Sequence, residues 1–323
     1  MSESNRSAEQ IHREAIVVVD HDHRPIGPDL PLMQAGGVTA KVYQVTLDVD
    51  VESGYTASKD RTDGWLRLAV EGMHAAHQEI DAHAEVCSLA RTAADIRQAK
   101  EQQRIAILLG AEGARWLEES LAPLHLFHHL GLRELQLTWA FANPLVPDGQ
   151  LSSFGRAVVA ECEKLGVIVD VTHIPRKAFD EVISLAQQPV IVSHGAAQSV
   201  TKDLDDDQLQ ALASTGGLLG IHFYITYLGP NPSPEDVVKQ IDYVAELVGV
   251  DHIALGVDFF PTKGPWYDLQ AAQGATNLQW AVDDMSGMGI ITECLVKRGY
   301  HEGDIHKILG GNFLRVCETV FGA

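Results

Sequence analysis

Four residues with metal-binding or proton-transferring side chains each follow a short apolar run of the sequence. They are Glu112, His173, His194 and Asp258. Imidazole nitrogens and carboxylate oxygens are the usual ligands of zinc and similar divalent ions in proteins. Any one of these residues alone is most simply a polar side chain hydrogen-bonded to a loop. Four residues in equivalent positions favour one shared metal site.

A further polar group, Asp20-His21-Asp22-His23-Arg24, follows the apolar residues Ile16-Val17-Val18-Val19. Successive side chains of a strand point to opposite faces, which puts Asp20, Asp22 and Arg24 on one face. His21 and His23 would lie on the other face. A one-residue slip or bulge would exchange the two faces, so both registers have to be considered.

The elements that must position these residues alternate between strands and helices along the whole chain. Most of the predicted strands are nearly continuous apolar runs, which is typical of parallel strands covered on both faces. The eight runs are Ile16–Asp20, Val38–Thr46, Ile105–Gly110, Glu134–Thr138, Val167–Val171, Val190–Ser193, Gly217–Phe223 and His252–Gly256.

This alternation predicts a (β/α)8 TIM barrel, in which chemistry gathers at the carboxyl ends of the strands. An open doubly wound sheet is the alternative. No glycine-rich phosphate loop follows any of the strands, which disfavours nucleotide binding. We expect one domain, a metal-dependent hydrolase barrel over residues 1–323, with the polar residues 1–10 flexible.

The charge of the chain excludes some partners. The 323 residues carry 44 acidic and 24 basic side chains, a formal charge of −20. Such a chain repels nucleic acid and anionic membranes, and no stretch of about 20 apolar residues could span a bilayer. The four cysteines have neither zinc-ribbon nor redox-pair spacing. We therefore predict a cytoplasmic protein with a small-molecule substrate and no nucleic-acid or membrane partner, and leave a homodimer open.

Taken together, the motifs resemble the membrane (renal) dipeptidase family of metallopeptidases, a branch of the amidohydrolase superfamily. The resemblance extends over nearly the full length, and the order and spacing of its pieces make it specific. The motifs that carry it are Gly110–Gly113, Ser153–Arg156, Asp170–His173, Val192–His194, Gly256–Phe259 and Ile308–Val316.

The resemblance implies a binuclear zinc hydrolase that cleaves dipeptides. In that pattern Glu112 would bridge the two metals, and His173 and His194 would bind the second one. Two cations that share a hydroxide supply a nucleophile near neutral pH and polarise the scissile carbonyl. Asp258 would accept the proton of the hydroxide and deliver it to the leaving amine.

Three positions depart from the family pattern. The family holds its first metal with a His-x-Asp pair, and the register set by Asp20 puts Asp22 and Arg24 in those two places. Arginine stays protonated and cannot bind a metal. Trp139 stands where the family has a substrate-contacting histidine, and Lys202 stands where an arginine binds the substrate carboxylate.

We favour this register because Asp20 follows four apolar residues, as in the family. Asp22 is then the remaining ligand of the first metal, and Arg24 supplies positive charge near Glu112. The register predicts one firmly bound zinc ion and leaves the second in doubt. It also predicts a metal content that does not depend on His21 or His23. In the other register His21 and His23 form a His-x-His pair, and two metals can bind.

The leading functional prediction is a metal-dependent hydrolase that cleaves the amide bond of a dipeptide or N-acyl amino acid through a metal-bound hydroxide. The alternative is a barrel that binds a small molecule and has lost hydrolytic activity. A mononuclear lyase or isomerase on the same scaffold is a third reading, because one fold supports many chemistries.

Overall fold

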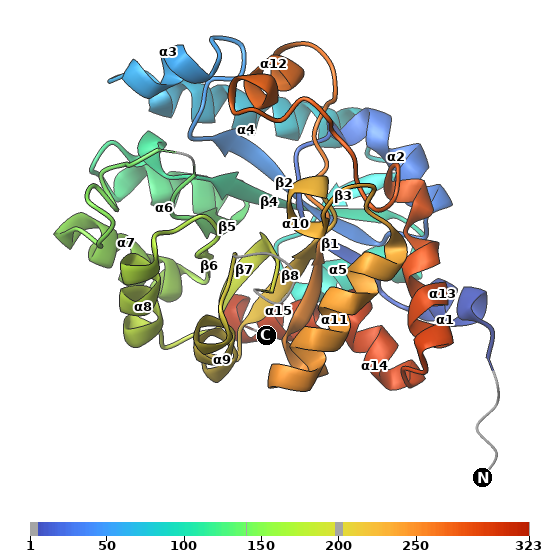
Figure 1. Ribbon diagram of the computed structural model, residues 1–323. Helices are drawn as coiled ribbons and strands as arrows, with labels where there is room; N and C mark the ends of the chain where they lie inside the picture. Colours follow the sequence, from blue (N-terminus) through green and yellow to red (C-terminus); the bar gives the residue numbers. More distant parts are fainter. Residues whose placement is uncertain (1–5, 140, 198–202, 323) are drawn as a thin grey trace.

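Eight parallel strands follow one another around a barrel in the computed structural model, which describes residues 6–139, 141–197 and 203–322 (Figure 1). The hydrogen-bonded order is β1-β2-β4-β5-β6-β7-β8-β9. The eight strands are β1 (Val18–Asp22), β2 (Ala40–Leu47), β4 (Ile105–Glu112), β5 (Leu132–Gln136), β6 (Ile168–Asp170), β7 (Val190–Gly195), β8 (Leu218–His222) and β9 (Ile253–Gly256).

The first and last strands meet through backbone hydrogen bonds at the carboxyl end. The Asp258 amide donates to the His21 carbonyl oxygen at 3.1 Å, and the His23 amide donates to the Phe259 carbonyl oxygen at 2.9 Å. The predicted barrel is confirmed, and each of the eight predicted runs overlaps one of its strands. A short strand that the sequence did not indicate, β3 (Cys87–Leu89), pairs with the first half of β4.

Helices connect the strands and surround the barrel (Figure 1). Their bounds are α1 (Ala8–Glu14), α2 (Ile26–Ala35), α3 (Tyr55–Asp60), α4 (Trp65–Ala82), α5 (Ala93–Glu101), α6 (Ala122–Leu130), α7 (Ser153–Leu165), α8 (Arg176–Leu185), α9 (Asp206–Ser214), α10 (Ile225–Leu228), α11 (Pro234–Val248), α12 (Pro265–Ala272), α13 (Gly289–Arg298), α14 (Glu302–His306) and α15 (Asn312–Phe321).

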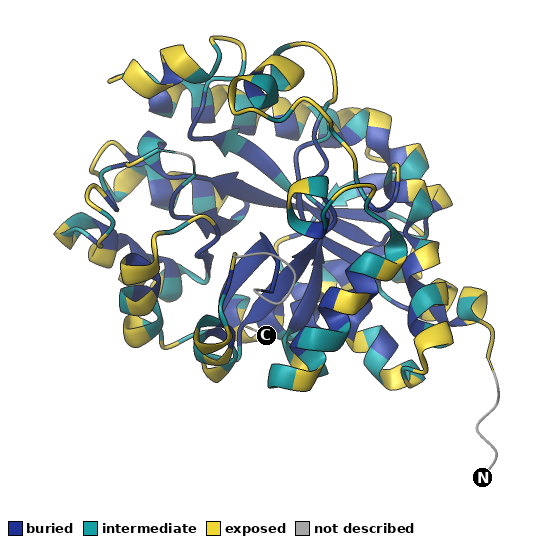
Figure 2. Cartoon of the chain, viewed as in Figure 1, coloured by how far each residue is buried: buried dark blue, intermediate teal, exposed yellow. Residues whose placement is uncertain are grey.

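The hydrophobic core has two main parts. One lies between the barrel wall and the surrounding helices, and Val19 belongs to it. The other fills the amino-terminal end of the barrel, where Val18 and Leu108 pack with Phe313 of α15. In Figure 2 the strands are accordingly dark blue, and exposed residues colour the outer faces of the helices yellow. Because α15 covers the amino-terminal end, the carboxyl end is left for a functional site.

The amino-terminal segment is only partly described. Residues 1–5 of the segment expected to be flexible lie outside the described residues. Ser7 caps α1, and its side chain accepts a hydrogen bond from the Gln10 amide. Among the described residues, no helix combines the length and hydrophobicity that crossing a membrane requires.

Candidate metal centre

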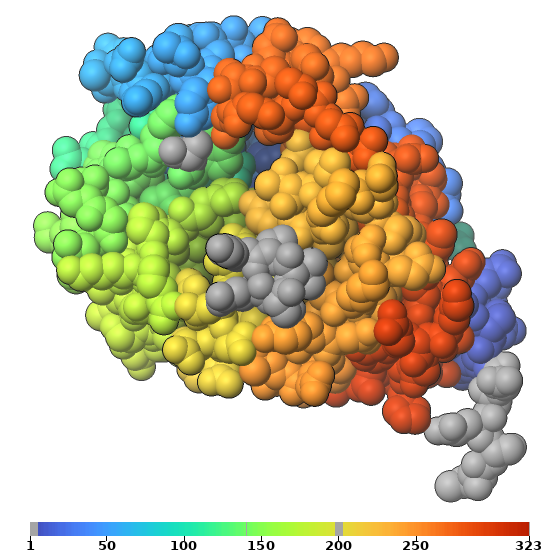
Figure 3. All heavy atoms as spheres, in the orientation of Figure 1, coloured from blue at the N-terminus to red at the C-terminus, as the bar shows by residue number. Residues whose placement is uncertain are grey.

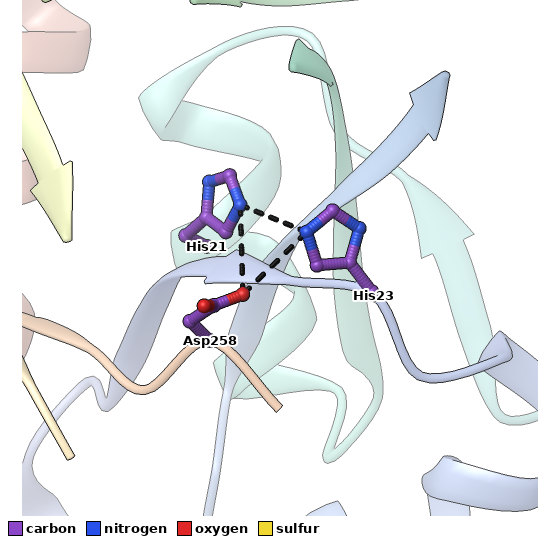
Figure 4. Close-up of side chains that lie close together, drawn as sticks. All are labelled: His21, His23 and Asp258. Carbon is purple, nitrogen blue, oxygen red and sulfur yellow. Dashed lines mark hydrogen bonds and ion pairs between the residues drawn. The ribbon is translucent and has the colours of Figure 1, made fainter. Parts of the chain in front are cut away.

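His21 and His23 of β1 and its following turn lie at the carboxyl end of the barrel, against Asp258 (Figure 4). Their Nε2 atoms are 3.2 Å apart. The His23 Nε2 atom lies 3.5 Å from Asp258 Oδ1 and 3.0 Å from Glu112 Oε2. His21 and His23 are both buried. The two histidines therefore occupy the position that the favoured sequence register gave to Asp22 and Arg24.

The favoured register was wrong, and the alternative His-x-His register is confirmed. The pairing of β1 with β2 shifts between Val19 and Asp22, so simple alternation fails at this point of the strand. The Asp22 carboxylate is fully buried and lies 2.7 Å from the Lys41 ammonium group. Arg24 pairs with Asp29 at 3.6 Å. Neither residue takes the predicted place beside Glu112.

Glu112, the last residue of β4, lies between two pairs of histidines. Its Oε2 atom faces His21 and His23, at 3.8 and 3.0 Å from their Nε2 atoms. Its Oε1 atom faces His173 and His194, at 3.5 and 3.8 Å. The His173 and His194 Nε2 atoms are 3.0 Å apart. The structure therefore brings Glu112, His173 and His194 together, as the sequence predicted.

Two residues of the centre hold unusual backbone conformations. His173 has φ of 63° and Asp258 has φ of 48°, in the left-handed region that residues other than glycine rarely adopt. Such conformations persist where the surrounding structure over-determines them, often in functional sites. His173 and Asp258 lie shortly after the ends of β6 and β9. The His173 side chain faces Glu112, and the Asp258 side chain faces His23.

Ser193 of β7 contacts one histidine of each pair. Its Oγ atom donates to Asp170 Oδ2 at 2.6 Å, so its lone pairs remain to accept hydrogen bonds. The Nδ1 atoms of His21 and His194 lie 3.2 and 3.0 Å from that oxygen. Donation from Nδ1 of His194 to Ser193 leaves its Nε2 with a lone pair, as a metal ligand requires, whereas Nδ1 of His21 also lies 3.0 Å from the Gln44 amide nitrogen.

The backbone around Ser193 is tightly packed. A Cβ atom added at Gly220 or Gly256 would lie 1.9 or 2.1 Å from the Ser193 carbonyl oxygen. Only glycine therefore allows β8 and β9 to approach β7 this closely. The approach keeps Ser193, and with it the two imidazoles, in a fixed place.

Electrostatics favour an ionised Glu112 carboxylate and shift the pKa values of His194 and His23 in opposite directions. Burial alone would raise the pKa of Glu112, but hydrogen bonds from His173, His21 and His23 outweigh it and hold that pKa well below its ordinary value. Burial, with the charges of His21 and His173, lowers the pKa of His194 well below its usual range. Burial also lowers the pKa of His23, but the hydrogen bond and charge of Glu112 reverse the sign and raise it.

A layer of acids lies deeper in the barrel. Asp20, Glu134 and Asp170 are all buried. Burial and the neighbouring Asp170 charge raise the pKa of Asp20 well above its ordinary value, and burial with the charges of Asp170 and Asp20 does the same to the pKa of Glu134. Burial thus favours the neutral form of Asp20 and Glu134 beneath the centre.

The donor set fits divalent cations. Two facing Nε2 atoms with lone pairs repel one another unless a positive charge lies near them. His21, His23 and Asp258 offer ligand atoms within 4.8 Å of one another, and so do His21, Glu112 and His194. Nitrogen and carboxylate oxygen donors of this kind suit zinc. The residues are therefore compatible with a metal on each side of Glu112.

The other predicted site residues lie farther out or outside the described part. Trp139 packs with Leu47, Val49 and Leu269 in a small apolar cluster at the carboxyl end of β2. Lys202 lies outside the described residues. Figure 3 shows a hollow on this face, between the orange segment of α12 and the gold segment of α10.

Sequence reasoning missed His222. It is the last residue of β8, and its Nε2 atom lies 3.3 Å from Asp258 Oδ2. A signal for it is present in the sequence, because His222 lies at the end of an apolar run, as His194 does.

Comparisons with known proteins agree with this geometry. A model of the membrane dipeptidase family (peptidase family M19) matches residues 9–322. Dipeptidase verJ of Clonostachys rogersoniana is 28% identical over 272 residues, which cover 79% of this chain and 66% of that protein. Dipeptidase 3 of Mus musculus is 28% identical over 285 residues, covering 83% of this chain and 54% of that protein. The chain thus spans between about half and two thirds of these curated relatives.

Among solved structures, an amidohydrolase from Pseudomonas aeruginosa superposes with a TM-score of 0.86 at 27% identity. The match covers 98% of this chain and all of the other one. The family match extends over nearly the whole chain and includes every residue of the metal centre described above. The chain therefore belongs to the membrane dipeptidase family.

Proposed function

We propose that the protein is a zinc-dependent hydrolase that cleaves the amide bond of a dipeptide or N-acyl amino acid. The observation that carries the proposal is the position of Glu112, with one carboxylate oxygen toward each pair of histidines and Asp258 beside them. The family supports the same activity. All four cysteines are free, which supports the reducing cytoplasm as the compartment.

Each residue of the centre has a distinct role in this proposal. His21 and His23 would hold one ion, His173 and His194 the other, and Glu112 would contact both. Bound divalent ions would polarise the scissile carbonyl and lower the pKa of a water molecule. Asp258, only partly buried, accepts a proton from the attacking water and returns it to the leaving nitrogen.

Two substrate contacts remain proposals from the sequence. Trp139 lies near the mouth, where its ring and the apolar cluster around Leu47 would favour an apolar part of the substrate. Lys202 would pair with the substrate carboxylate. Lysine keeps the positive charge of the arginine in the family but lacks its two-pronged geometry, so carboxylate recognition would be less specific.

A second candidate is a barrel that binds the same kind of molecule without cleaving it. Trp139 favours this reading, because an indole cannot act as the histidine of the family does. The sequence also seemed to lack a pair of ligands for the first metal, which would favour this reading. That feature no longer applies, because His21 and His23 lie beside Glu112.

The deciding experiment measures turnover of a panel of dipeptides and N-acyl amino acids by the zinc-loaded protein. We expect chelator-sensitive hydrolysis that Asp258→Asn lowers by about 100-fold or more, the usual contribution of general acid–base catalysis. Asp251→Asn, on the exposed surface, is the matched control. No turnover by the wild-type protein at full metal occupancy would favour the binding reading.

A further inference from the structure

His222 is held in one orientation by three neighbours. The backbone amide of Tyr224 donates a hydrogen bond to its Nδ1 atom at 3.1 Å. The Tyr227 ring stacks on the imidazole, with centroids 4.1 Å apart and planes 22° from parallel. On the far side of the ring, Nε2 lies 3.3 Å from Asp258 Oδ2. The side chain is only 1% exposed, so water does not compete for these contacts.

The amide of Tyr224 decides where the proton of His222 lies. A ring nitrogen that accepts a hydrogen bond carries no proton, and a neutral imidazole has one protonated nitrogen. The proton is therefore on Nε2, and His222 donates it to Asp258 Oδ2.

This hydrogen bond gives the two oxygens of Asp258 different surroundings. Oδ2 faces His222, whereas Oδ1 faces His21 and His23 at 3.9 and 3.5 Å. The main chain of Asp258 is also held, because its amide donates to the His21 carbonyl and its carbonyl accepts from the Trp280 indole. The rotations that remain for the residue are those of its side chain.

We infer that His222 is a positioning residue for the proposed hydrolysis. Its Nε2–H group holds Oδ2 of Asp258 and keeps Oδ1 on the side of His21 and His23, as the oxygen that accepts the proton. The inference rests on the proposed function of Asp258. It adds a residue from β8 to the centre and assigns it a single protonation form.

A role as metal ligand is the competing explanation, because ligand atoms of His194, His222 and Asp258 lie within 4.8 Å of one another. The tautomer argues against it. A metal needs a lone pair on the nitrogen that faces it, and the lone pair of neutral His222 is already used by the Tyr224 amide. Nε2 can bind a metal only after losing its proton.

The test compares His222→Gln with His222→Leu in the zinc-loaded protein. A glutamine amide can donate to Asp258 from nearly the same place, and leucine cannot. We expect kcat to fall about 10- to 100-fold in the leucine variant, with KM and metal content unchanged, and to recover most of that loss with glutamine. His252→Gln, at the amino-terminal end of β9, is the matched control.

Loss of bound metal in both variants would make His222 a ligand and overturn the inference, as would equal kcat values for leucine, glutamine and wild type. Nitrogen-15 NMR of labelled histidines gives a readout independent of activity and of the leucine variant's folding. The His222 signals, assigned by their absence from His222→Gln, should show a proton on Nε2. A proton on Nδ1 would overturn the inference about His222 but not the proposed hydrolysis. If the wild-type protein shows no turnover, the proposed hydrolysis, on which the inference rests, is overturned instead.

Discussion

Asp22 and Lys41 form an ion pair of 2.7 Å in the wall of the barrel, and both side chains are completely buried. The Lys41 ammonium group also donates to Asp29 Oδ2 at 2.9 Å and to the Arg24 carbonyl oxygen at 2.8 Å. The pair therefore holds the residues on both sides of His23. It draws Asp22 away from the mouth, which turns His21 and His23 toward Glu112.

Replacement of the pair by neutral residues tests this role. Asp22→Asn combined with Lys41→Met removes one charge of each sign and leaves Asp29 paired with Arg24. We expect a folded protein whose affinity for one metal equivalent is about 10- to 100-fold weaker, as when partners that orient ligands are lost. Metal titration against a competing chelator measures it.

Lys41→Met alone is the informative comparison, because it leaves Asp22 buried without its cation. Breaking a buried pair in this way costs about 3–5 kcal/mol, so the single variant should be much less stable than the double variant. Wild-type metal affinity in the double variant would show that the pair does not orient the two histidines.

The metal content of histidine variants gives a second prediction. His21→Ala or His23→Ala should remove about one metal equivalent, and His173→Ala or His194→Ala should weaken the other, because Glu112 presents a different oxygen to each pair. Atomic absorption after dialysis measures both equivalents. His74→Ala, on an exposed helix face, is the control. Metal content unchanged in all four variants would refute the centre.

Much of the fold was predictable because its signals are local. Apolar runs, helix caps such as that of Thr92, and the strand-end positions of Glu112 and His194 are all visible within a few residues. The short strand β3 was missed because three residues give too little pattern. Its pairing with Ile105–Ile107 stabilises it instead.

The register of β1 could not be obtained from local pattern. Asp22 and His23 are both plausible ligands by type, and alternation gives no preference once a bulge is allowed. The deciding contact is with Lys41, which is distant in the sequence and looks like an ordinary strand residue there. A lysine within an apolar run needs a buried acid, and that requirement was the available clue.

Ser193 provides the third prediction. Its hydroxyl oxygen lies beside Nδ1 of both His21 and His194, which belong to opposite sides of Glu112. Ser193→Ala should therefore weaken both metal equivalents together, by about 10- to 100-fold each. Chelator competition measures the two affinities. Ser214→Ala, on an exposed helix, is the control, and loss of only one equivalent would contradict the shared role of the serine.

The last prediction concerns stability and pH at Asp48, a buried residue just beyond β2. Its Oδ1 atom accepts from the Arg115 amide at 2.8 Å, and its Oδ2 atom accepts from Asn143 at 3.1 Å. Burial nevertheless raises the pKa of Asp48 from 3.8 to about 6. The folded protein thus binds this proton more tightly than the unfolded chain does. Asp48 consequently lowers the free energy of unfolding as the pH rises from about 4 to about 6.

Asp48→Asn and Asp48→Ala both remove that dependence. Relative to wild type, the stability of each variant should rise by up to roughly 3 kcal/mol between pH 4 and 6, since a pKa shift of about two units corresponds to that energy. The two variants will differ from each other by a constant, because asparagine keeps an acceptor for the Arg115 amide and alanine does not. Urea unfolding at several pH values measures these differences. Parallel stability curves for wild type and both variants would mean that the pKa of Asp48 is not raised by burial.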